Sequence, residues 1–107
     1  MKAIEIHWTA ASKKEARRVA QLCCQKKLAA CVQIGPEIES HYIWKGKIET
    51  SKEIRVVFKT TQNRFTAIKK LILENCSYEI PEIIAFPITA GFEPYLKWIE
   101  ESTTHLP

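Results

Sequence analysis

Glycine is scarce in this chain of 107 residues: it occurs only at Gly35, Gly46 and Gly91, and no two of these positions are close together. Loops that cradle phosphate groups in P-loop and dinucleotide-binding proteins need several glycines within one short segment. The sequence therefore excludes both kinds of nucleotide-binding loop.

Long apolar runs are missing as well, because the longest spans residues 28–32. A membrane-spanning helix needs about 20 such residues, so we expect no membrane association.

The cysteine pattern excludes the common zinc motifs. The four cysteines form no C-x-x-C pair, and the three histidines stand apart from one another. Zinc knuckles and fingers need such pairs at fixed spacing. Near the N-terminus, Glu5 and His7 interrupt the apolar core that a secretory signal peptide requires. We therefore expect reduced thiols and a cytoplasmic location.

Length and composition indicate one globular domain, residues 1–107. The chain has the usual domain size of about 100–200 residues, with 46% hydrophobic and 26% charged residues. These proportions are not those of a disordered chain. The net charge of +4 is mild, so charge alone does not indicate a nucleic-acid partner.

Hydrophobic periodicity predicts the N-terminal elements. Residues 3–9 alternate between apolar and polar side chains, as a half-buried strand does. Ser12 and Glu15 then form a capping box, in which each side chain is expected to bond the backbone amide of the other residue, so a helix begins at Lys13. Cys23 falls on the apolar face of this helix, within one arc of its core-facing residues.

The central part of the chain predicts a long β-hairpin. Residues 30–44 and 47–59 contain most of the β-branched and aromatic side chains of this region. The two residues between these arms end in Gly46, which can supply the positive φ of a tight turn. Since proline has no amide to donate, Pro36 after Gly35 indicates a bulge or bend in the first arm.

A second helix, a short strand and a third helix complete the pattern. Either Thr60 or Thr61 can cap the second helix, and residues 83–86 form a strand whose continuation into Pro87 indicates a sheet edge or a bulge. Pro94 suits the first turn of the last helix. The apolar side of that helix is expected to consist of Tyr95, Trp98 and Ile99. The order β-α-β-β-α-β-α predicts a ferredoxin-like α+β sandwich, βαββαβ, with a long central hairpin and an extra C-terminal helix.

The length of the hairpin predicts self-association. Each arm extends about 45 Å at about 3.3 Å per residue, whereas a domain of this size has a diameter near 35 Å, given a radius of gyration of about 13 Å. The overhang exposes an edge that carries Ile43, Trp44 and Ile48. Pairing with another copy would cover this edge. The alternative is a monomer in which the segment around Gly35 bends the arm back.

Five short blocks stand in a fixed order along the chain. They are residues 28–32 (LAACV), 42–49 (YIWKGKIE), 59–61 (KTT), 78–84 (YEIPEII) and 95–98 (YLKW). In this order and spacing they resemble the CutA family of divalent-cation tolerance proteins, from Ile4 to about Glu101. The resemblance implies a fold similar to the PII signalling proteins and a stable homotrimer built by sheets joined edge to edge. It also implies tolerance of copper and other divalent ions, which several members bind, and no established enzymatic activity.

The sequence departs from the family's pattern at the positions proposed to hold metal. The resemblance implies His-Pro before the block at 78–84, where this chain has Cys76 and a serine. Asn75 and Trp8 replace a second histidine and a cysteine found in some bacterial members. Cys76 alone keeps metal-binding chemistry, and a thiolate suits Cu(I) better than imidazole does. One thiolate per subunit makes a site only if three meet at an axis or His7 joins it.

Five residues are candidates for a binding site. Cys76 is the candidate ligand for copper or another divalent cation, or else a small apolar filler at a helix end. Glu79 and Glu82 can bind a hard cation or line a pocket, unless they are solvated or salt-bridged acids. Tyr42 and Trp44 are candidates for a cleft between subunits, or pack on the hairpin's own face. No organic cofactor is implied.

A basic stripe on the first helix raises the question of RNA. RNA-recognition domains share this fold and carry a basic-Gly-aromatic signature on the third strand. Here that strand contains residues 54–58 and has no glycine, so no nucleic-acid partner is expected. We therefore interpret the basic stripe as the solvent-exposed face of the first helix. It consists of Lys13, Lys14, Arg17 and Arg18.

The sequence therefore predicts a cytoplasmic, homotrimeric, non-enzymatic divalent-cation tolerance protein that binds copper or another divalent metal ion. One alternative is a PII-like sensor that binds a small anionic ligand in the clefts between subunits. A second alternative is a purely structural trimeric scaffold. A metal stoichiometry near one per subunit favours the first function, and a thermal shift caused by a metabolite without metal favours the sensor.

Overall fold

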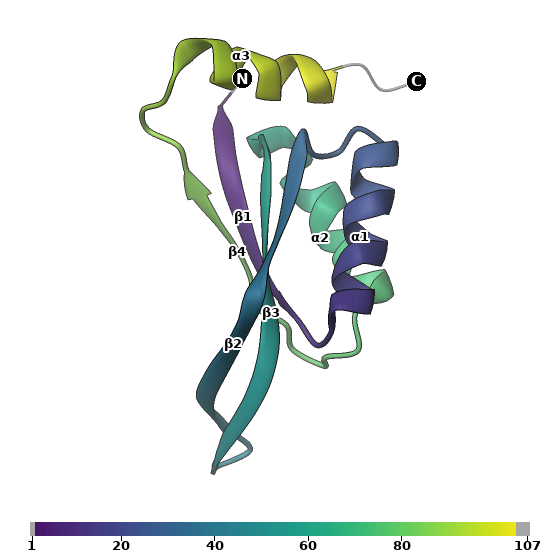
Figure 1. The fold of residues 1–107 in the computed structure, drawn as a ribbon, viewed down its shortest axis with the longest axis vertical. Coiled ribbons are helices and arrows are strands. Elements are labelled where there is room, and N and C mark those ends of the chain that lie inside the picture. The colour runs from purple at the N-terminus through teal and green to yellow at the C-terminus, as the bar shows by residue number, and fades with distance from the viewer. Residues whose placement is uncertain (1, 105–107) are drawn as a thin grey trace.

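An antiparallel sheet with two helices on one face forms the body of the structure, a computed structural model that describes residues 2–104 (Figure 1). Its elements are β1 (Ala3–Ala10), α1 (Lys13–Gln25), β2 (Cys31–Trp44), β3 (Lys47–Thr61), η1 (Gln62–Arg64), α2 (Phe65–Asn75), β4 (Ile83–Pro87) and α3 (Glu93–Thr104). The strand order is β2-β3-β1-β4, and every neighbouring pair is antiparallel. The predicted ferredoxin-like α+β fold is confirmed.

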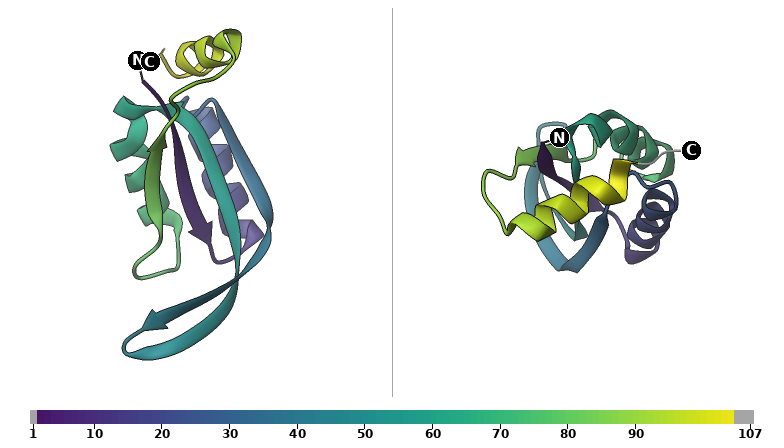
Figure 2. Two further views of the ribbon diagram at one scale, coloured as in Figure 1. Left: turned by 90° about the vertical axis from the view of Figure 1, so that its left-hand side faces the viewer. Right: turned by 90° about the horizontal axis from the view of Figure 1, so that it is seen from above.

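The core lies between the sheet and the helices α1 and α2. The alternation predicted for the first strand holds, because Ile4, Ile6 and Trp8 are buried while the residues between them are half-buried. Cys23 packs into the same core from α1. Both helices lie on the same side of the sheet (Figure 2). No helix covers the other face of the sheet, which we call the open face.

The first helix begins where the sequence predicts, but only half of its capping box forms. The Ser12 hydroxyl accepts a hydrogen bond from the amide of Glu15 at 3.2 Å. The Glu15 carboxylate does not return to the amide of Ser12. It accepts hydrogen bonds from Ser77 instead, because a tertiary partner carrying two donors competes with the local cap.

The predicted threonine cap of the second helix is wrong. The turn η1 precedes α2, and Arg64 stands at the N-cap of α2 without a side-chain hydrogen bond that caps the helix. The Thr60 hydroxyl donates to the carbonyl of Leu28 at 2.6 Å, and the Thr61 hydroxyl donates to the side chain of Asn63. Thr60 is buried, so its hydroxyl bonds the carbonyl group that lies beside it in the folded chain and does not cap the helix.

The hairpin of β2 and β3 projects beyond the helices (Figure 1). Its turn is the predicted one, with positive φ at both Lys45 and Gly46, as a two-residue turn of type I′ requires. The longest dimension of the structure is 44 Å. Near the tip, the side chains of Ile43 and Ile48 are 78% and 82% exposed. The overhang and the exposed apolar edge are therefore both present.

A β-bulge in β2 changes which face its side chains occupy. Ile34 pairs with Val56, but Glu37 pairs with Ile54, so β2 has one more residue than β3 between these pairs. Before the bulge, the even-numbered residues of β2 pack against the core. After it, they turn to the opposite face, because one extra residue reverses the alternation. The predicted bulge is confirmed, and Gly35 lies where an added Cβ would stand 3.0 Å from the carbonyl oxygen of Arg55.

The last helix lies across the end of the sheet far from the hairpin turn (Figure 1). Ile99 is buried there, and the Arg64 guanidinium donates to the carbonyl of Thr103. Tyr95 and Trp98, expected on the same apolar side, are 39% and 43% exposed. Of the three residues expected on this side, Ile99 alone is therefore buried within the described part of one chain. None of the helices in the described part is long and apolar enough to span a membrane.

Candidate functional site

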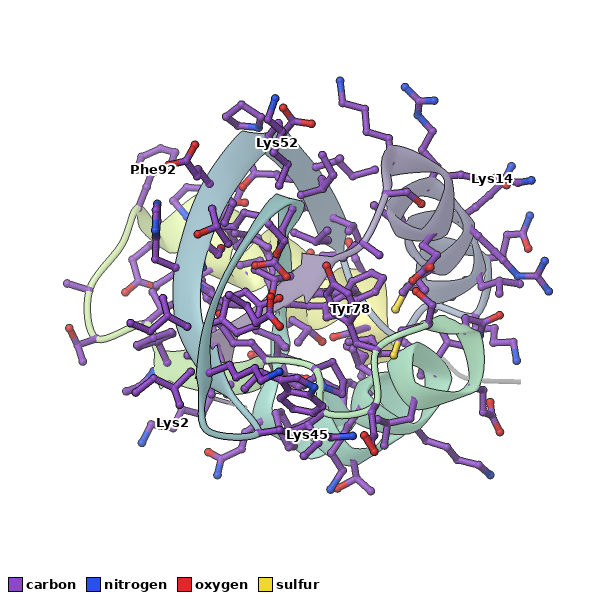
Figure 3. The ribbon with its side chains drawn as sticks, turned by 90° about the horizontal axis from the view of Figure 1, so that it is seen from below. Lys2, Lys14, Lys45, Lys52, Tyr78 and Phe92 are labelled. Carbon is purple, nitrogen blue, oxygen red and sulfur yellow. The ribbon has the colours of Figure 1, made fainter. Side chains whose placement is uncertain are left out.

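A cavity of about 470 Å³ lies where the hairpin bends under the loop between α2 and β4. Two groups of side chains dominate its walls, three aromatic rings and three carboxylates. The aromatic residues are Tyr42, Trp44 and Tyr78, and the acids are Glu53, Glu79 and Glu82. Thr9, Ser40, Ser77 and Ile80 complete the lining. Figure 3 shows Tyr78 between the hairpin and the helices, with Lys45 at the hairpin turn.

Four of the five candidate residues predicted from the sequence meet at this cavity. Tyr42 and Trp44 come from β2, while Glu79 and Glu82 come from the loop before β4. The bulge brings the two aromatics here, since it turns them to the face that also carries Glu53. Their roles in a pocket or an interface stay predictions.

The loop before β4 is held against the first helix. The Glu15 carboxylate, in the first turn of α1, accepts hydrogen bonds from the amide of Ser77 at 3.1 Å and from its hydroxyl at 2.7 Å. These bonds fix the segment that leads into Tyr78. The adjacent contact of α1 with α2 adds a hydrogen bond from Arg18 to the side chain of Asn75 at 2.9 Å.

Tyr78 is a site residue that the sequence reasoning missed. Burial, together with a hydrogen bond to the carboxylate of Glu53, raises the pKa of Tyr78 to about 12. The phenol therefore stays protonated and donates to this carboxylate. Tyr78 belongs to the block at 78–84 that carries the family resemblance, and this membership was the only sign of its importance in the sequence. Nothing in the sequence links Tyr78 to Glu53.

The walls of the cavity are negatively charged. They contain three carboxylates and no lysine, arginine or histidine, although the chain as a whole has a net charge of +4. Among residues 2–104, Glu82 is the only one of the three that forms an ion pair, with the guanidinium of Arg55 at 3.7 Å. A positively charged ligand is therefore favoured over an anion by the local potential.

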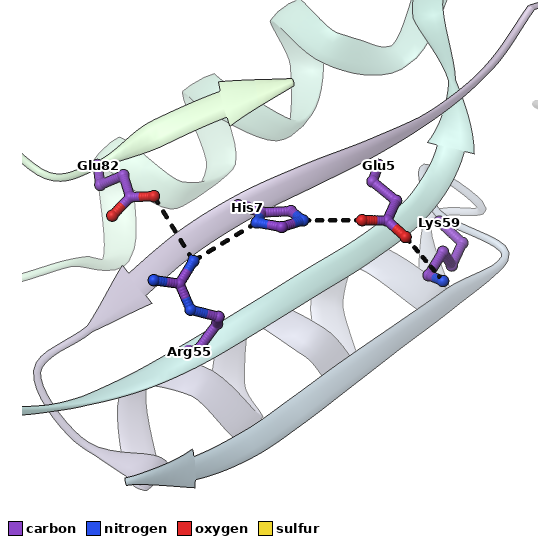
Figure 4. A network of polar contacts seen from close by, with 5 residues as sticks. All are labelled: Glu5, His7, Arg55, Lys59 and Glu82. Carbon is purple, nitrogen blue, oxygen red and sulfur yellow. Dashed lines mark hydrogen bonds and ion pairs between the residues drawn. The ribbon is translucent and has the colours of Figure 1, made fainter. Parts of the chain in front are cut away.

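A polar network on the open face joins this cavity to the middle of the sheet (Figure 4). Arg55 bridges Glu82 and His7, since its Nη1 lies 3.4 Å from the Nδ1 atom of the imidazole. The Nε2 atom of His7 lies 2.8 Å from the Glu5 carboxylate, and Lys59 lies 3.1 Å from the same carboxylate. The hydrogen bond with His7, and then the contact with Lys59, outweigh burial and lower the pKa of Glu5.

Cys76 lies outside the cavity. It is the C-cap of α2, packs against the core, and its thiol donates to the carbonyl of Tyr78 at 3.6 Å. Burial raises the pKa of the Cys76 thiol, which opposes formation of the thiolate that a metal needs. His7 lies on the open face of the sheet, so the structure does not bring these two candidate ligands together.

The described residues of one chain provide no cluster of metal ligands. Among residues 2–104, no three His, Cys, Asp or Glu side chains are grouped to hold a metal ion. Cys23, Cys24, Cys31 and Cys76 are all free thiols, and of these Cys24 is exposed. The residues present therefore do not fit a metal site built by a single chain, and the role of Cys76 as a ligand stays a prediction.

Fold and cavity together define a small ferredoxin-like α+β protein with an extended hairpin and a ligand-sized site beneath it. A family model described as "CutA1 divalent ion tolerance protein" matches residues 4–102. The chain therefore belongs to the CutA1 divalent ion tolerance protein family.

Individual relatives agree with this assignment. The chain is 41% identical over 97 residues to "Divalent-cation tolerance protein CutA" of Archaeoglobus fulgidus, covering 91% of this chain and 94% of that protein. It is 38% identical over 100 residues to "Protein CutA, chloroplastic" of Arabidopsis thaliana, where the match covers 94% of this chain. The chain spans about half the length of that plant relative, 55%.

Solved structures of similar proteins have the same fold. CutA1 from the psychrotrophic bacterium Shewanella sp. SIB1 matches with a TM-score of 0.93 and 38% identity, covering 97% of both chains. The periplasmic divalent cation tolerance protein CutA from Archaeoglobus fulgidus matches with a TM-score of 0.91 and 39% identity, covering 94% of this chain and 98% of that one.

Proposed function

We propose that this protein acts in divalent-cation tolerance as a cytoplasmic, non-enzymatic homotrimer. The observation that supports assembly best is the projecting hairpin, where Ile43 and Ile48 are 78% and 82% exposed on a strand pair with no helix beside it. A long apolar edge of this kind aggregates unless a defined partner covers it. A second copy of the chain is the simplest such partner.

The sheet topology supports a closed ring of copies. Its outer strands are β2 and β4, and each is paired on one side only. Pairing of the β2 edge of one copy with the different β4 edge of the next would be a head-to-tail contact, and such contacts form a ring when the rotation between copies closes. The family resemblance implies that the ring has three members. The exposed rings of Tyr95 and Trp98 on α3 add further apolar surface for a neighbour.

We propose that a metal ion binds between copies of the chain in the assembly and not within a single chain. Copper or another divalent cation would be held by Cys76 thiolates from more than one copy, since one chain groups no set of three ligands within residues 2–104. A soft thiolate ligand favours Cu(I). The cytoplasmic location is supported by the four free cysteines, which persist as thiols in a reducing compartment.

Multi-angle light scattering tests the proposal. We expect a mass near three times 12.3 kDa at micromolar concentration. The double variant Ile43→Ser with Ile48→Ser should give a lower mass with unchanged circular dichroism, because both side chains are exposed in the isolated subunit. Leu73→Ser is the matched control, since Leu73 is also exposed, at 51%, but lies on α2 away from the hairpin. A wild-type protein that stays monomeric would contradict the proposal.

A structural scaffold is the second candidate function. It is favoured because residues 2–104 of one chain group no three side chains that could hold a metal ion. A trimer that binds no metal in any oxidation state would assign the protein to that role. The anion sensor has less support, because the walls of the cavity carry three carboxylates and no basic side chain.

A further inference from the structure

We propose that the cavity beneath the hairpin is a binding site for a small organic ammonium ion, held between aromatic rings and carboxylates of one chain. This function goes beyond the proposed role in metal tolerance, which assigns the metal to Cys76, outside the cavity. The volume of about 470 Å³ lies within the range of small-molecule sites, roughly 300–1,000 Å³.

The charge of the walls selects a cation. Glu79 has no ion-pair partner within the described residues, and Glu53 is met by the neutral phenol of Tyr78. Glu82 is partly neutralised by Arg55 at 3.7 Å, which is the only such ion pair at the cavity in the part of the chain that the structure describes. At least two carboxylates therefore keep their charge inside a concave site, where field lines are focused and cations concentrate.

The aromatic rings select an organic cation. Tyr42, Trp44 and Tyr78 surround the same space, and aromatic faces attract ammonium groups that lie within about 6 Å of the ring centroid. Trp44 already shows this behaviour, since the Lys45 ammonium lies 5.6 Å from its ring centroid. Recognition of methylated ammonium groups by several rings follows the same physics.

A bare metal ion fits these walls less well. The three carboxylates do not form a group that can hold an ion within the described part of the chain. Hard cations need six or more oxygen ligands at short range, whereas half of the dominant side chains here are aromatic. An organic ammonium ion can interact with the carboxylates through its charge and with the aromatic rings through its ammonium and apolar groups.

The inference is tested by calorimetric titration of the full-length protein with choline at low ionic strength. The control ligand is the neutral isostere of choline, in which a tert-butyl group replaces the trimethylammonium group. We expect choline to bind and the isostere to bind at least about fivefold more weakly, as loss of a cation–π contact predicts. Added salt should weaken choline binding, because charges that face solvent are screened.

Two variants test the walls separately. Trp44→Leu removes a ring and should weaken choline binding by about fivefold or more, and Trp44→Phe should restore part of the loss. Glu79→Gln removes one exposed charge without changing the shape of the wall and should also weaken choline. The matched controls are Phe92→Leu, an exposed aromatic just before α3, and Glu101→Gln, an exposed acid on α3, and both should bind choline as the wild type does.

The outcomes decide between the possible ligands. Equal affinity for choline and its isostere would overturn the proposal, as would an unchanged choline affinity in Glu79→Gln. Failure of choline to bind at millimolar concentration would overturn it too. Displacement of choline by Mg²⁺ at equal concentration would reassign the site to metal ions, and binding of acetate in place of choline would reassign it to anions. Glu79→Gln changes no residue of the hairpin, so the result for this variant can be separated from the trimer proposal, which rests on the hairpin edge.

Discussion

Glu15 and Ser77, which lie 62 positions apart in the sequence, are joined by two hydrogen bonds to one carboxylate. The amide and the hydroxyl of Ser77 both donate to Glu15, at 3.1 and 2.7 Å. This contact fixes the loop that carries Tyr78 and Glu79 to the first turn of α1. A carboxylate in a first turn also lies favourably at the positive end of the helix dipole, so the same group serves the helix and the site.

We predict that Glu15→Gln lowers the free energy of unfolding by roughly 1 kcal/mol, because charge-assisted hydrogen bonds are replaced by neutral ones. Ser77→Ala should cost less, since the backbone amide keeps its bond. A double-mutant cycle in urea unfolding measures the coupling, which should be about 0.5–1 kcal/mol. Strict additivity of the two variants would show that the contact contributes nothing to stability.

The hairpin turn makes a prediction about two adjacent residues. Lys45 and Gly46 have φ values of 51° and 78°, and a Cβ on Gly46 would meet nothing within 4 Å. Gly46→Ala should therefore destabilise the fold by about 1 kcal/mol through backbone strain alone. Lys45→Asn should stabilise it by a few tenths of a kcal/mol, because asparagine tolerates this conformation better. Urea unfolding midpoints of both variants check these signs, and a stabilising Gly46→Ala would contradict the turn geometry.

Alkaline pH should destabilise the protein through Cys23. Burial raises the pKa of this thiol from 9.0 to about 12, so the folded state keeps a proton that the unfolded chain has already lost. The free energy of unfolding therefore falls as the pH rises from 9 to 12. Cys23→Ala should be less stable at neutral pH, because it leaves a small gap in the core, but it should lose stability less steeply in this window. Parallel slopes for wild type and variant, measured in urea at several pH values, would remove Cys23 as the cause.

Removal of one thiol should separate the candidate metal ligand from its competitor. We expect Cys76→Ser to abolish tight Cu(I) binding and to leave assembly intact, because a hydroxyl is similar in size but is a poor soft ligand. Affinity in the wild type should rise with pH, since burial raises the pKa of the Cys76 thiol and metal binding releases its proton. Competition titrations with Cu(I), Cu(II) and Zn(II) measure both effects.

The control for that experiment is Cys24→Ser, because Cys24 is the exposed free thiol. This variant should bind copper as the wild type does. Loss of binding in Cys24→Ser alone would move the site to α1. If wild-type reduced protein binds no copper tighter than about micromolar, roughly −8 kcal/mol, the metal role does not apply to this chain.

Local sequence patterns predict most of the fold. The alternation of β1, the start of α1 at Lys13, the turn at Gly46 and the bulge after Gly35 each depend on neighbours in the sequence, and the structure confirms each. The predicted caps of the first two helices show where local sequence patterns stop predicting the structure. Ser12 bonds a residue three positions away, as predicted, whereas Thr60 is buried and takes a partner 32 positions away.

The candidate site, too, could be predicted from the sequence only in part. Tyr42, Trp44, Glu79 and Glu82 are recognisable in the sequence as residue types suited to a pocket, yet no local rule places them around one cavity. Tyr78 was missed because its importance depends on Glu53, which only the folded chain brings within hydrogen-bonding distance.

The sequence by itself determined the order of elements and the family, because periodicity, turns and caps act over a few residues and the five blocks lie in order along the chain. Only the tertiary structure decided which face the hairpin aromatics occupy, since one extra residue at Gly35 reverses the alternation of everything after it. It also decided that Glu15 bonds Ser77 instead of its own helix cap. Both outcomes depend on groups that become neighbours only after folding, when burial and hydrogen-bond competition select among partners that the sequence leaves open.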